Sequence, residues 1–231
     1  MSKIGSSRPP RSQRARLRAR SQPELKTRKS ERTRAAILNA ALDFLWSHPF
    51  HEMTVNSVMA STEAGRSAFY AHFKDLHELM ETLLKMLQDE IFAVVEPWLE
   101  GSGDPVALLD ETLTGLIQVC YQQGPFLRAI SDAATTDDRL GKAWQQFLGR
   151  FDDVGYGRIV ADQEQGLIPD FDPRPVIIAL NRLNAYTIIK AFGQHPRRQP
   201  KPVGEALARI WISTLYGPAF VATGSSTLVR N

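Results

Sequence analysis

The sequence predicts an all-α protein in which a short N-terminal helical unit precedes a larger helical domain. From about residue 31 onward, apolar residues recur three and four positions apart, which is the spacing of one face of an α-helix. No stretch shows the sustained alternation of apolar and polar residues that is typical of a strand, and glycine or proline residues separate the periodic segments. We therefore expect four parts: a disordered arm (1–30), a three-helix unit (31–74), the larger domain (75–221) and a tail (222–231).

The first helix of the N-terminal unit is predicted by one apolar stripe, and Pro49 follows its end. The stripe consists of Ile37, Ala40, Ala41, Phe44 and Leu45. Thr54 is placed as the N-cap of a second, short helix, because its hydroxyl can accept a hydrogen bond from a backbone N–H of the first turn. A break around residues 63–65 separates this helix from a third short helix that carries Phe69 and Phe73.

The helices of the larger domain are predicted by their caps and breaks. Asp75 with Glu78 forms a capping box for a helix over about 75–96, and Pro97 comes near its end. Gly166 and Gly193 stand where two later helices should stop. The further helices are expected over about 104–122, 125–134, 137–165, 173–192 and 203–216.

Charge is distributed unevenly along the 231 residues. Residues 1–34 hold twelve Lys or Arg against two Glu and carry a net charge of +10, whereas the remaining 197 residues carry −7. Such a basic segment gains free energy on a polyanion by releasing counterions. It has almost no apolar face to insert into a membrane surface, so nucleic acid is the expected partner.

Several functional classes are excluded by what the sequence does not contain. The longest uninterrupted apolar runs span about five residues, far below the ~20 of a membrane span. The single cysteine, Cys120, cannot form an internal disulfide or a thiolate zinc site, and it is expected to be buried. No nucleophile elbow, zinc-protease, phosphate-loop or dinucleotide motif is present, so we expect no enzyme activity, no cofactor and no metal.

The segment 54–74 has the organisation of a helix-turn-helix, in which two short helices joined by a tight turn pack against a first helix. The second of them must begin with side chains that fit the ~12 Å major groove, and Arg66-Ser67-Ala68 meets this demand. Arg66 can reach a guanine edge, and Ser67 can reach a base or a phosphate. Tyr70 and His72 fall on or beside the same side. The alternative is a short helical hairpin that binds no nucleic acid.

The stretch Thr54–Leu79 resembles the DNA-binding region of the tetracycline-repressor (TetR) family. The Tyr70-Ala71-His72-Phe73 segment followed by an acidic-rich helix is the most specific part, and the first helix, Ala35–Trp46, also suits the family. The resemblance implies contacts with bases or phosphates from Thr54, Arg66, Ser67, Ala68, Tyr70, His72 and Lys74.

The turn departs from the family pattern of glycine, aliphatic residue and serine-like cap. The corresponding residues here are Glu63, Ala64 and Gly65, and Leu76 replaces a frequent lysine at the start of the fourth helix. A non-glycine residue with positive φ would cost roughly 1 kcal/mol, so we expect a reshaped turn.

The stretch Ser131–Gly217 is similar to the ligand domain of one TetR subgroup, the ethionamide-activation repressor (EthR) type, through residues 143–151, 179–184 and 210–217. Asn181 and Asn184 also interrupt an otherwise apolar helix, where a buried amide needs hydrogen-bond partners. The resemblance places the following residues on the walls of a ligand pocket: Ile117, Tyr121, Trp144, Asn181, Asn184 and Trp211. The alternative is that the asparagines bridge neighbouring helices and the aromatic residues are ordinary core.

Together these features predict a ligand-responsive transcriptional regulator, a repressor, released from DNA by a small hydrophobic effector. The resemblance implies a homodimer formed through the last two long helices, a roughly palindromic double-stranded DNA operator and a location in the bacterial cytoplasm at the nucleoid. The helix over 75–96 would be the lever between the DNA-binding unit and the pocket. Two rival functions remain: a non-specific, nucleoid-type DNA-binding protein without an effector, and a small-molecule carrier or enzyme on a helical scaffold.

Overall fold

The structure, a computed structural model, describes residues 11–217, with side chains described from residue 27 onward. All regular elements of this part are helices, so the all-α prediction is confirmed. The chain divides into two units, residues 1–47 with 53–76 and residues 48–52 with 77–231, and the parts outside 11–217 are not described. The expected tail (222–231) and the first ten residues of the expected arm therefore lie outside the described residues.

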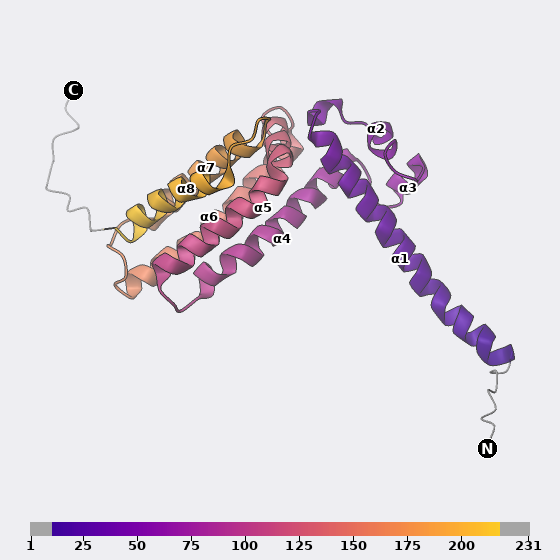
Figure 1. The fold of residues 1–231 in the computed structure, drawn as a ribbon, viewed down its shortest axis with the longest axis horizontal. Coiled ribbons are helices and arrows are strands. Elements are labelled where there is room, and N and C mark those ends of the chain that lie inside the picture. Colours follow the sequence, from indigo (N-terminus) through magenta and orange to yellow (C-terminus); the bar gives the residue numbers. More distant parts are fainter. Residues whose placement is uncertain (1–10, 218–231) are drawn as a thin grey trace, which may run out of the picture. The chain divides into compact units, whose positions relative to one another are not determined.

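Unit 1 contains one long helix and two short ones (Figure 1). They are α1 (Arg11–Leu45), α2 (Val55–Met59) and α3 (Arg66–Tyr70). The apolar stripe predicted for the first helix is its buried face, since Ile37, Ala41 and Leu45 are fully buried. α2 begins at the predicted N-cap: Thr54 Oγ1 accepts a hydrogen bond from the Ser57 backbone N–H at 3.0 Å.

The start of α1 differs from the expectation. We placed it near residue 31 after a disordered arm, whereas residues 11–30 belong to the helix in the structure. Most of these residues are Arg, Lys, Ala, Leu or Gln, which are strong helix formers, so helix propensity extends the helix beyond its apolar stripe and past Pro23.

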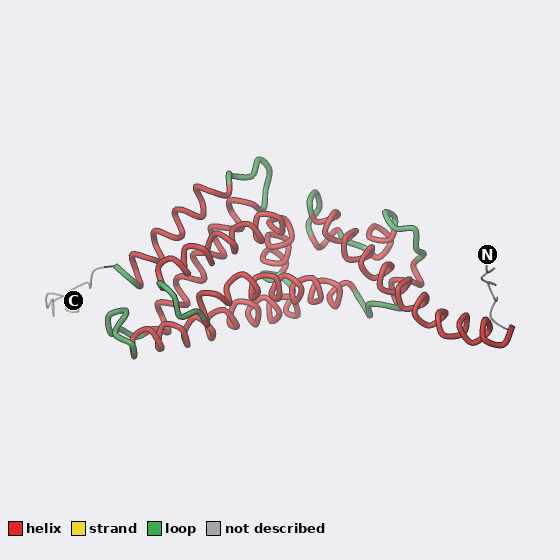
Figure 2. The backbone as a smooth tube through the Cα atoms, turned by 60° about the horizontal axis from the view of Figure 1, so that its bottom comes forward, coloured by secondary structure: helices red, strands yellow, loops and turns green. Residues whose placement is uncertain are grey.

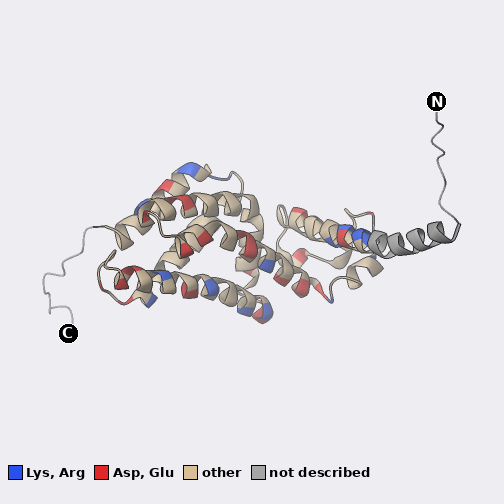
Figure 3. Cartoon of the chain, turned by 90° about the horizontal axis from the view of Figure 1, so that it is seen from below, with Lys and Arg blue, Asp and Glu red and all other residues tan. Residues whose placement is uncertain are grey.

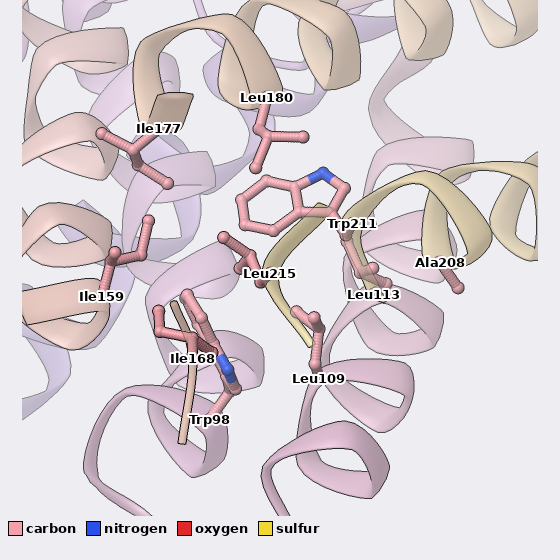
Figure 4. Close-up of a cluster of buried hydrophobic side chains, with 10 residues drawn as sticks. All are labelled: Trp98, Leu109, Leu113, Ile159, Ile168, Ile177, Leu180, Ala208, Trp211 and Leu215. Atoms are coloured by element: carbon pink, nitrogen blue, oxygen red, sulfur yellow. The ribbon is translucent and has the colours of Figure 1, made fainter. Parts of the chain in front are cut away.

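Unit 2 is a bundle of long helices, and Figures 1 and 2 show them running alongside one another. They are α4 (Leu76–Glu100), α5 (Pro105–Ala133), α6 (Asp138–Glu164), α7 (Pro173–Phe192) and α8 (Pro200–Leu215). The same unit includes a short 3-10 helix, η1 (Phe50–Glu52), which lies between α1 and α2 in the chain. α5 packs against α6, α7 and α8. The side chains at the centre of one buried cluster are Trp98, Leu109, Leu113, Ile159, Ile168, Ile177, Leu180, Ala208, Trp211 and Leu215 (Figure 4).

Acidic N-caps and a C-terminal glycine set several ends of these helices. Asp104, Asp137 and Asp172 each accept backbone N–H groups of the helix that follows. Gly166 has a φ of +69°, and the Leu167 N–H bonds the Asp162 carbonyl at 2.9 Å, which closes α6 in the manner expected of a C-terminal glycine.

Two prolines do not end helices as predicted. α4 passes Pro97 and ends one turn later, with the Pro97 carbonyl accepting the Gly101 N–H at 2.9 Å. α5 runs unbroken through Pro125, although we expected a break at 122–125. A proline leaves the carbonyl four residues earlier without its helical donor. At Pro125 that carbonyl belongs to Tyr121, and the Arg197 guanidinium donates to it at 2.7 Å.

The start of α8 also differs from the expectation by three residues. We placed it near residue 203, and it begins at Pro200. Proline is favourable in the first turn of a helix because its missing N–H has no partner there.

We predict that Leu113→Ala lowers the free energy of unfolding of unit 2 by about 2–5 kcal/mol, because it removes a fully buried side chain from the central cluster and leaves a cavity. Urea unfolding followed by tryptophan fluorescence measures the change. Leu167→Ala is the matched control: Leu167 is 46% exposed, so its truncation should change stability by less than about 0.5 kcal/mol. Equal effects of the two substitutions would contradict the assignment of the core.

Candidate functional site

α3 is held by one face and leaves the other accessible. Phe69 is fully buried, and Phe73 just beyond the helix is buried as well; their ring centroids lie 5.7 Å apart. Arg34 of α1 covers the Phe73 ring, with its guanidinium carbon 5.2 Å from the ring centroid. The exposed face of α3 consists of Arg66, Ser67 and Tyr70.

Arg66 and Tyr70 form a pair on this exposed face. The Arg66 guanidinium donates to the Tyr70 hydroxyl at 3.2 Å, and its carbon lies 5.7 Å from the centroid of the Tyr70 ring. The Tyr70 side chain is 51% exposed. The sequence predicts that both residues contact DNA, but it does not predict that they contact each other. Their spacing of four residues on one helix was the signal that could have indicated this contact.

The turn between α2 and α3 is built without any left-handed residue. No described non-glycine residue has a positive φ, and Gly65, the N-cap of α3, is extended with φ −80° and ψ 168°. The departures from the family pattern at Glu63 and Ala64 therefore carry no backbone strain.

The remaining predicted DNA contacts occupy different environments. Lys74 is exposed, whereas Ala68 and His72 are half-buried, the latter with its ring beside that of Phe73 at 6.5 Å. Thr54 is exposed, but its hydroxyl already serves the capping box with Ser57. Arg66, Ser67, Tyr70 and Lys74 are thus the predicted residues with the most accessible side chains.

Unit 2 contains a cavity of about 100 Å³ with almost entirely apolar walls. Every long helix of the unit contributes to it, including the aromatic side chains of Trp98, Trp144, Phe147, Phe151 and Trp211. Four of the six residues predicted for a pocket line it: Trp144, Asn181, Asn184 and Trp211.

The two asparagines are each fixed by one half of their amide. Asn184 accepts a hydrogen bond from the Trp211 indole N–H at 2.9 Å. Asn181 donates to Asp152 at 2.9 Å, and Arg182 donates to the same carboxylate at 2.8 Å. The asparagines thus bridge neighbouring helices and also line the cavity.

Comparisons with known proteins agree with this architecture. Residues 109–217 match the family model of the C-terminal domain of the transcriptional regulator EthR. The chain is 24% identical over 195 residues to the HTH-type transcriptional regulator EthR of Mycolicibacterium smegmatis, covering 82% of this chain and 88% of that protein. Residues 109–217 form a domain of the EthR type, and most of the chain is similar to an EthR transcriptional regulator.

Solved structures of TetR-family proteins share its fold. A protein of Syntrophomonas wolfei assigned to this family matches with a TM-score of 0.72 at 15% identity, over 84% of this chain and 99% of that chain. The TetR-family regulator PfmR of Thermus thermophilus matches with a TM-score of 0.64 at 17% identity, over 79% and 98%. The homologues are regulators rather than enzymes, as the sequence predicts.

Two residues that the resemblance places on the pocket walls, Ile117 and Tyr121, lie elsewhere in the bundle. Ile117 is buried beside Gly204 of α8, where an added Cβ would come within 3.5 Å of its side chain. Tyr121 packs edge-on against Phe192 at 5.3 Å and under the Arg197 guanidinium at 4.1 Å. Neither is among the residues that line the cavity, because their side chains pack against neighbouring segments of the bundle instead.

Sequence reasoning missed two small residues on the cavity wall, Thr112 and Cys120, both on α5. The Thr112 hydroxyl is buried and has no hydrogen-bond partner among the described residues. Burial raises the pKa of the Cys120 thiol to about 12, with a smaller contribution from the charge of Glu90. Cys120 is buried, as the sequence predicts. The only signal in the sequence for Thr112 was that a polar residue stands on the apolar stripe of its helix.

A buried polar network closes the far end of α4. The Trp98 indole N–H donates to the Tyr216 hydroxyl at 3.0 Å, which donates in turn to Asp162 at 2.6 Å. Arg158 pairs with Asp162 at 3.0 Å and donates to the Gly101 carbonyl at 3.0 Å. Burial and the hydrogen bond to Asp162 raise the pKa of Tyr216 to about 12.

The described residues contain neither a helix long and apolar enough to cross a membrane nor a group of three or more candidate metal ligands.

We predict that Tyr216 gives the folded protein a stability that alkali removes. Because its folded pKa lies above the ordinary value near 10, the contribution is complete below pH 10 and is lost as pH rises through about 12. Tyr216→Phe should therefore flatten the fall of stability between pH 10 and 12, as measured by urea unfolding across this range. The exposed Tyr186→Phe is the control, and an identical alkaline fall in all three proteins would contradict the network.

Proposed function

We propose that this regulator is a ligand-responsive repressor that binds a roughly palindromic operator at the nucleoid as a homodimer and is released by a small hydrophobic effector. The observation that carries the proposal is the presence, in one chain, of an accessible Arg66–Tyr70 pair on a short helix and an apolar cavity in the other unit. The first is a surface for bases, and the second is a site for an effector.

The geometry of α3 supports direct reading of the major groove. An arginine is the most frequent partner of guanine there, through two donors aimed at O6 and N7. The hydrogen bond to Tyr70 and the ring beneath the guanidinium restrict the conformations of Arg66 before DNA arrives. A restricted side chain loses less entropy on binding, which favours specific contact.

The basic N-terminal segment supports binding to the phosphate backbone. Arg28, Lys29 and Arg32 are exposed on α1, and Figure 3 shows basic residues gathered on this part of the helix. These charges supply attraction that does not depend on base sequence. We assign to these three residues the affinity for DNA of any sequence, and to Arg66 the specificity for the operator.

The cavity supports a neutral, largely apolar effector. Its walls carry no charged side chain, and the Asp152 carboxylate that Asn181 contacts is paired with Arg182. The amide N–H₂ of Asn184 and the carbonyl of Asn181 make no hydrogen bond to another described residue and are free for one polar group of a ligand. An apolar chain ending in a carboxamide meets these conditions.

The outer faces of α7 and α8 support a dimer. These helices pack against each other, and they leave three large apolar side chains exposed: Ile178, Tyr186 and Ile210. Between and beside them stand small residues, such as Ala179 and Ala206, that permit close approach of another helix pair. Two such faces meeting about a two-fold axis form a four-helix interface, and a two-fold dimer reads a palindrome.

A non-specific DNA-binding protein without an effector remains the alternative. It would rely on the basic segment alone and would have no use for an apolar cavity lined by two oriented amides. The cavity therefore favours the effector-responsive function.

We predict that Arg66→Ala lowers affinity for the operator by about 10- to 100-fold while leaving affinity for random DNA unchanged, because it removes one base contact. Selection of bound fragments from a random DNA pool first supplies the operator, and we expect a palindromic consensus. The triple change Arg28→Gln, Lys29→Gln, Arg32→Gln should weaken operator and random DNA alike and reduce the salt slope by about 0.9 for each phosphate that is no longer neutralised. Recovery of the same consensus with equal strength by Arg66→Ala would contradict its role.

We predict that Asn184→Ala and Asn181→Ala each weaken the binding of octanamide, a neutral carboxamide with an apolar chain, by about 10-fold, because each removes one hydrogen-bonding group from the cavity. Quenching of tryptophan fluorescence measures the binding, since Trp98, Trp144 and Trp211 line the cavity. Tyr121→Phe is the control and should bind octanamide like the wild type. Operator affinity without octanamide should stay the same in all three; its loss would indicate a structural role for the asparagines.

A further inference from the structure

Unit 2 carries a concentration of basic residues of its own, where α7 leads into α8. Residues 190–201 hold four Lys or Arg and neither Asp nor Glu, whereas residues 77–189 together with 202–217 hold nine Lys or Arg against nineteen Asp or Glu. The four cations, which we call the α7–α8 basic patch, are Lys190, Arg197, Arg198 and Lys201. The patch is therefore positive on a body with a net charge of −10.

The loop that carries the patch is fixed to the bundle. The Arg198 backbone N–H donates to the Ala191 carbonyl at 2.9 Å, and the Gly193 N–H donates to the Ile189 carbonyl at 2.9 Å. Gly193 lies close against α5, since an added Cβ would come within 2.8 Å of the Arg128 side chain. The backbone of the loop is thus held in place before any partner arrives.

Arg197 anchors the patch from within. Its guanidinium carbon lies 4.1 Å from the centroid of the Tyr121 ring, and the group donates to the Tyr121 carbonyl at 2.7 Å. Pro125 stands four residues after Tyr121, so this carbonyl has no donor from its own helix. Because a ring and a neutral carbonyl leave the guanidinium charged, Arg197 holds the loop and still adds to its positive potential.

The other three cations of the patch are accessible. The side chains of Lys190, Arg198 and Lys201 are exposed. Among the described residues they make one ion pair, in which Lys201 Nζ lies 3.8 Å from Glu205 and the two side chains are 85% and 66% exposed. Water screens a pair this long and this exposed, so it does not neutralise the patch.

The composition of the loop fits a hydrated polyanion better than a protein or a membrane. Its exposed residues are Gln194, His195, Pro196, Arg198 and Gln199, and none of them is a large apolar side chain. A protein interface has an apolar or aromatic centre, and a segment that binds a membrane surface needs apolar side chains to insert. Phosphate oxygens are instead bound by Arg, Lys and Gln side chains that stay partly in water.

We propose that the α7–α8 basic patch is a second phosphate-binding surface, through which unit 2 contacts the backbone of the DNA. Each cation that neutralises a phosphate releases counterions, so the patch adds affinity that does not depend on base sequence. The acidic remainder of unit 2 is repelled by the same backbone, so the patch also selects the face that unit 2 turns to the duplex. This inference rests on the proposed function, which makes DNA the polyanion.

The test is a triple variant of the full chain, the patch variant: Lys190→Gln, Arg198→Gln and Lys201→Gln. Glutamine removes each charge at an exposed position, and Arg197 remains to hold the loop. The control variant makes the same changes at two exposed lysines and one exposed arginine of α4 and α6: Lys85→Gln, Lys142→Gln and Arg150→Gln. Both variants therefore lose the same net charge, and far-UV circular dichroism checks that both keep their helices.

The first readout is the affinity for a duplex of random sequence at a series of salt concentrations. We expect the patch variant to reduce the salt slope by about 0.9 for each phosphate that is no longer neutralised, and the control variant to keep the slope of the wild type. Equal slopes in the patch and control variants would overturn the proposal. A wild type that binds no duplex at all would instead be a failure of the proposed function.

The second readout is ethylation interference on the operator, which identifies the phosphates that the protein contacts. We expect the patch variant to lose a set of phosphates that the control variant and Arg28→Gln, Lys29→Gln, Arg32→Gln retain. The same phosphates in the patch variant and in the wild type would overturn the contact.

A poly-glutamate peptide tests the alternative partner, an acidic protein segment. Binding of this peptide to the wild type but not to the patch variant, with DNA affinity unchanged, would overturn the proposal in favour of that partner. A wild type that selects no palindromic consensus from the random pool contradicts the proposed function and leaves the first readout, which needs no operator, in force.

Discussion

The exposed face of α3, with Arg66 and Tyr70, depends on the burial of two phenylalanines. α2 and α3 have five residues each, and isolated helices of that length do not persist in water. Burial of Phe69 and Phe73 inside unit 1 supplies the stabilisation that the short helices lack by themselves. Because these side chains occupy one face, Arg66 and Tyr70 are directed to the other, so the accessible pair follows from the same packing that makes the helix.

In unit 2, buried polar side chains make contacts between helices and thereby fix how the helices lie. Asp152 and Asp162 are both buried acids, and each is paired with an arginine and a further donor. Leaving either charge unpaired inside the bundle would cost several kcal/mol, so these contacts specify how α6 lies against α7 and α8. The cavity lies between these fixed points and is lined by residues that make few directional contacts, which is where a bundle can admit a ligand without losing its fold.

Local signals in the sequence were sufficient for most of the fold. The Thr54, Asp104, Asp137 and Asp172 caps and the glycine after α6 are short-range features, and the structure has helix ends at all of them. Pro125 could not be interpreted in this way, because the arginine that satisfies the Tyr121 carbonyl is 76 residues distant in sequence.

The residues of the candidate sites also divide into those that the sequence could predict and those that it could not. Trp144, Asn181, Asn184 and Trp211 lie on the cavity wall, but Ile117 and Tyr121 do not, since the side of α5 that faces the cavity is set by its packing against α7 and α8. The Arg66–Tyr70 contact and the Arg197–Tyr121 contact arise from side-chain conformation and from the meeting of distant segments, which periodicity does not encode.

The single thiol of the chain has a chemical consequence for signalling. Burial raises the pKa of Cys120 to about 12, so the thiol stays protonated at neutral pH, and the thiolate is the form that attacks peroxides and electrophiles. The Cys120 sulfur on the wall of the cavity is therefore unreactive and would not capture a molecule covalently. Oxidants and alkylating agents would react slowly with this residue, so a molecule that enters the cavity would leave it without forming a covalent bond.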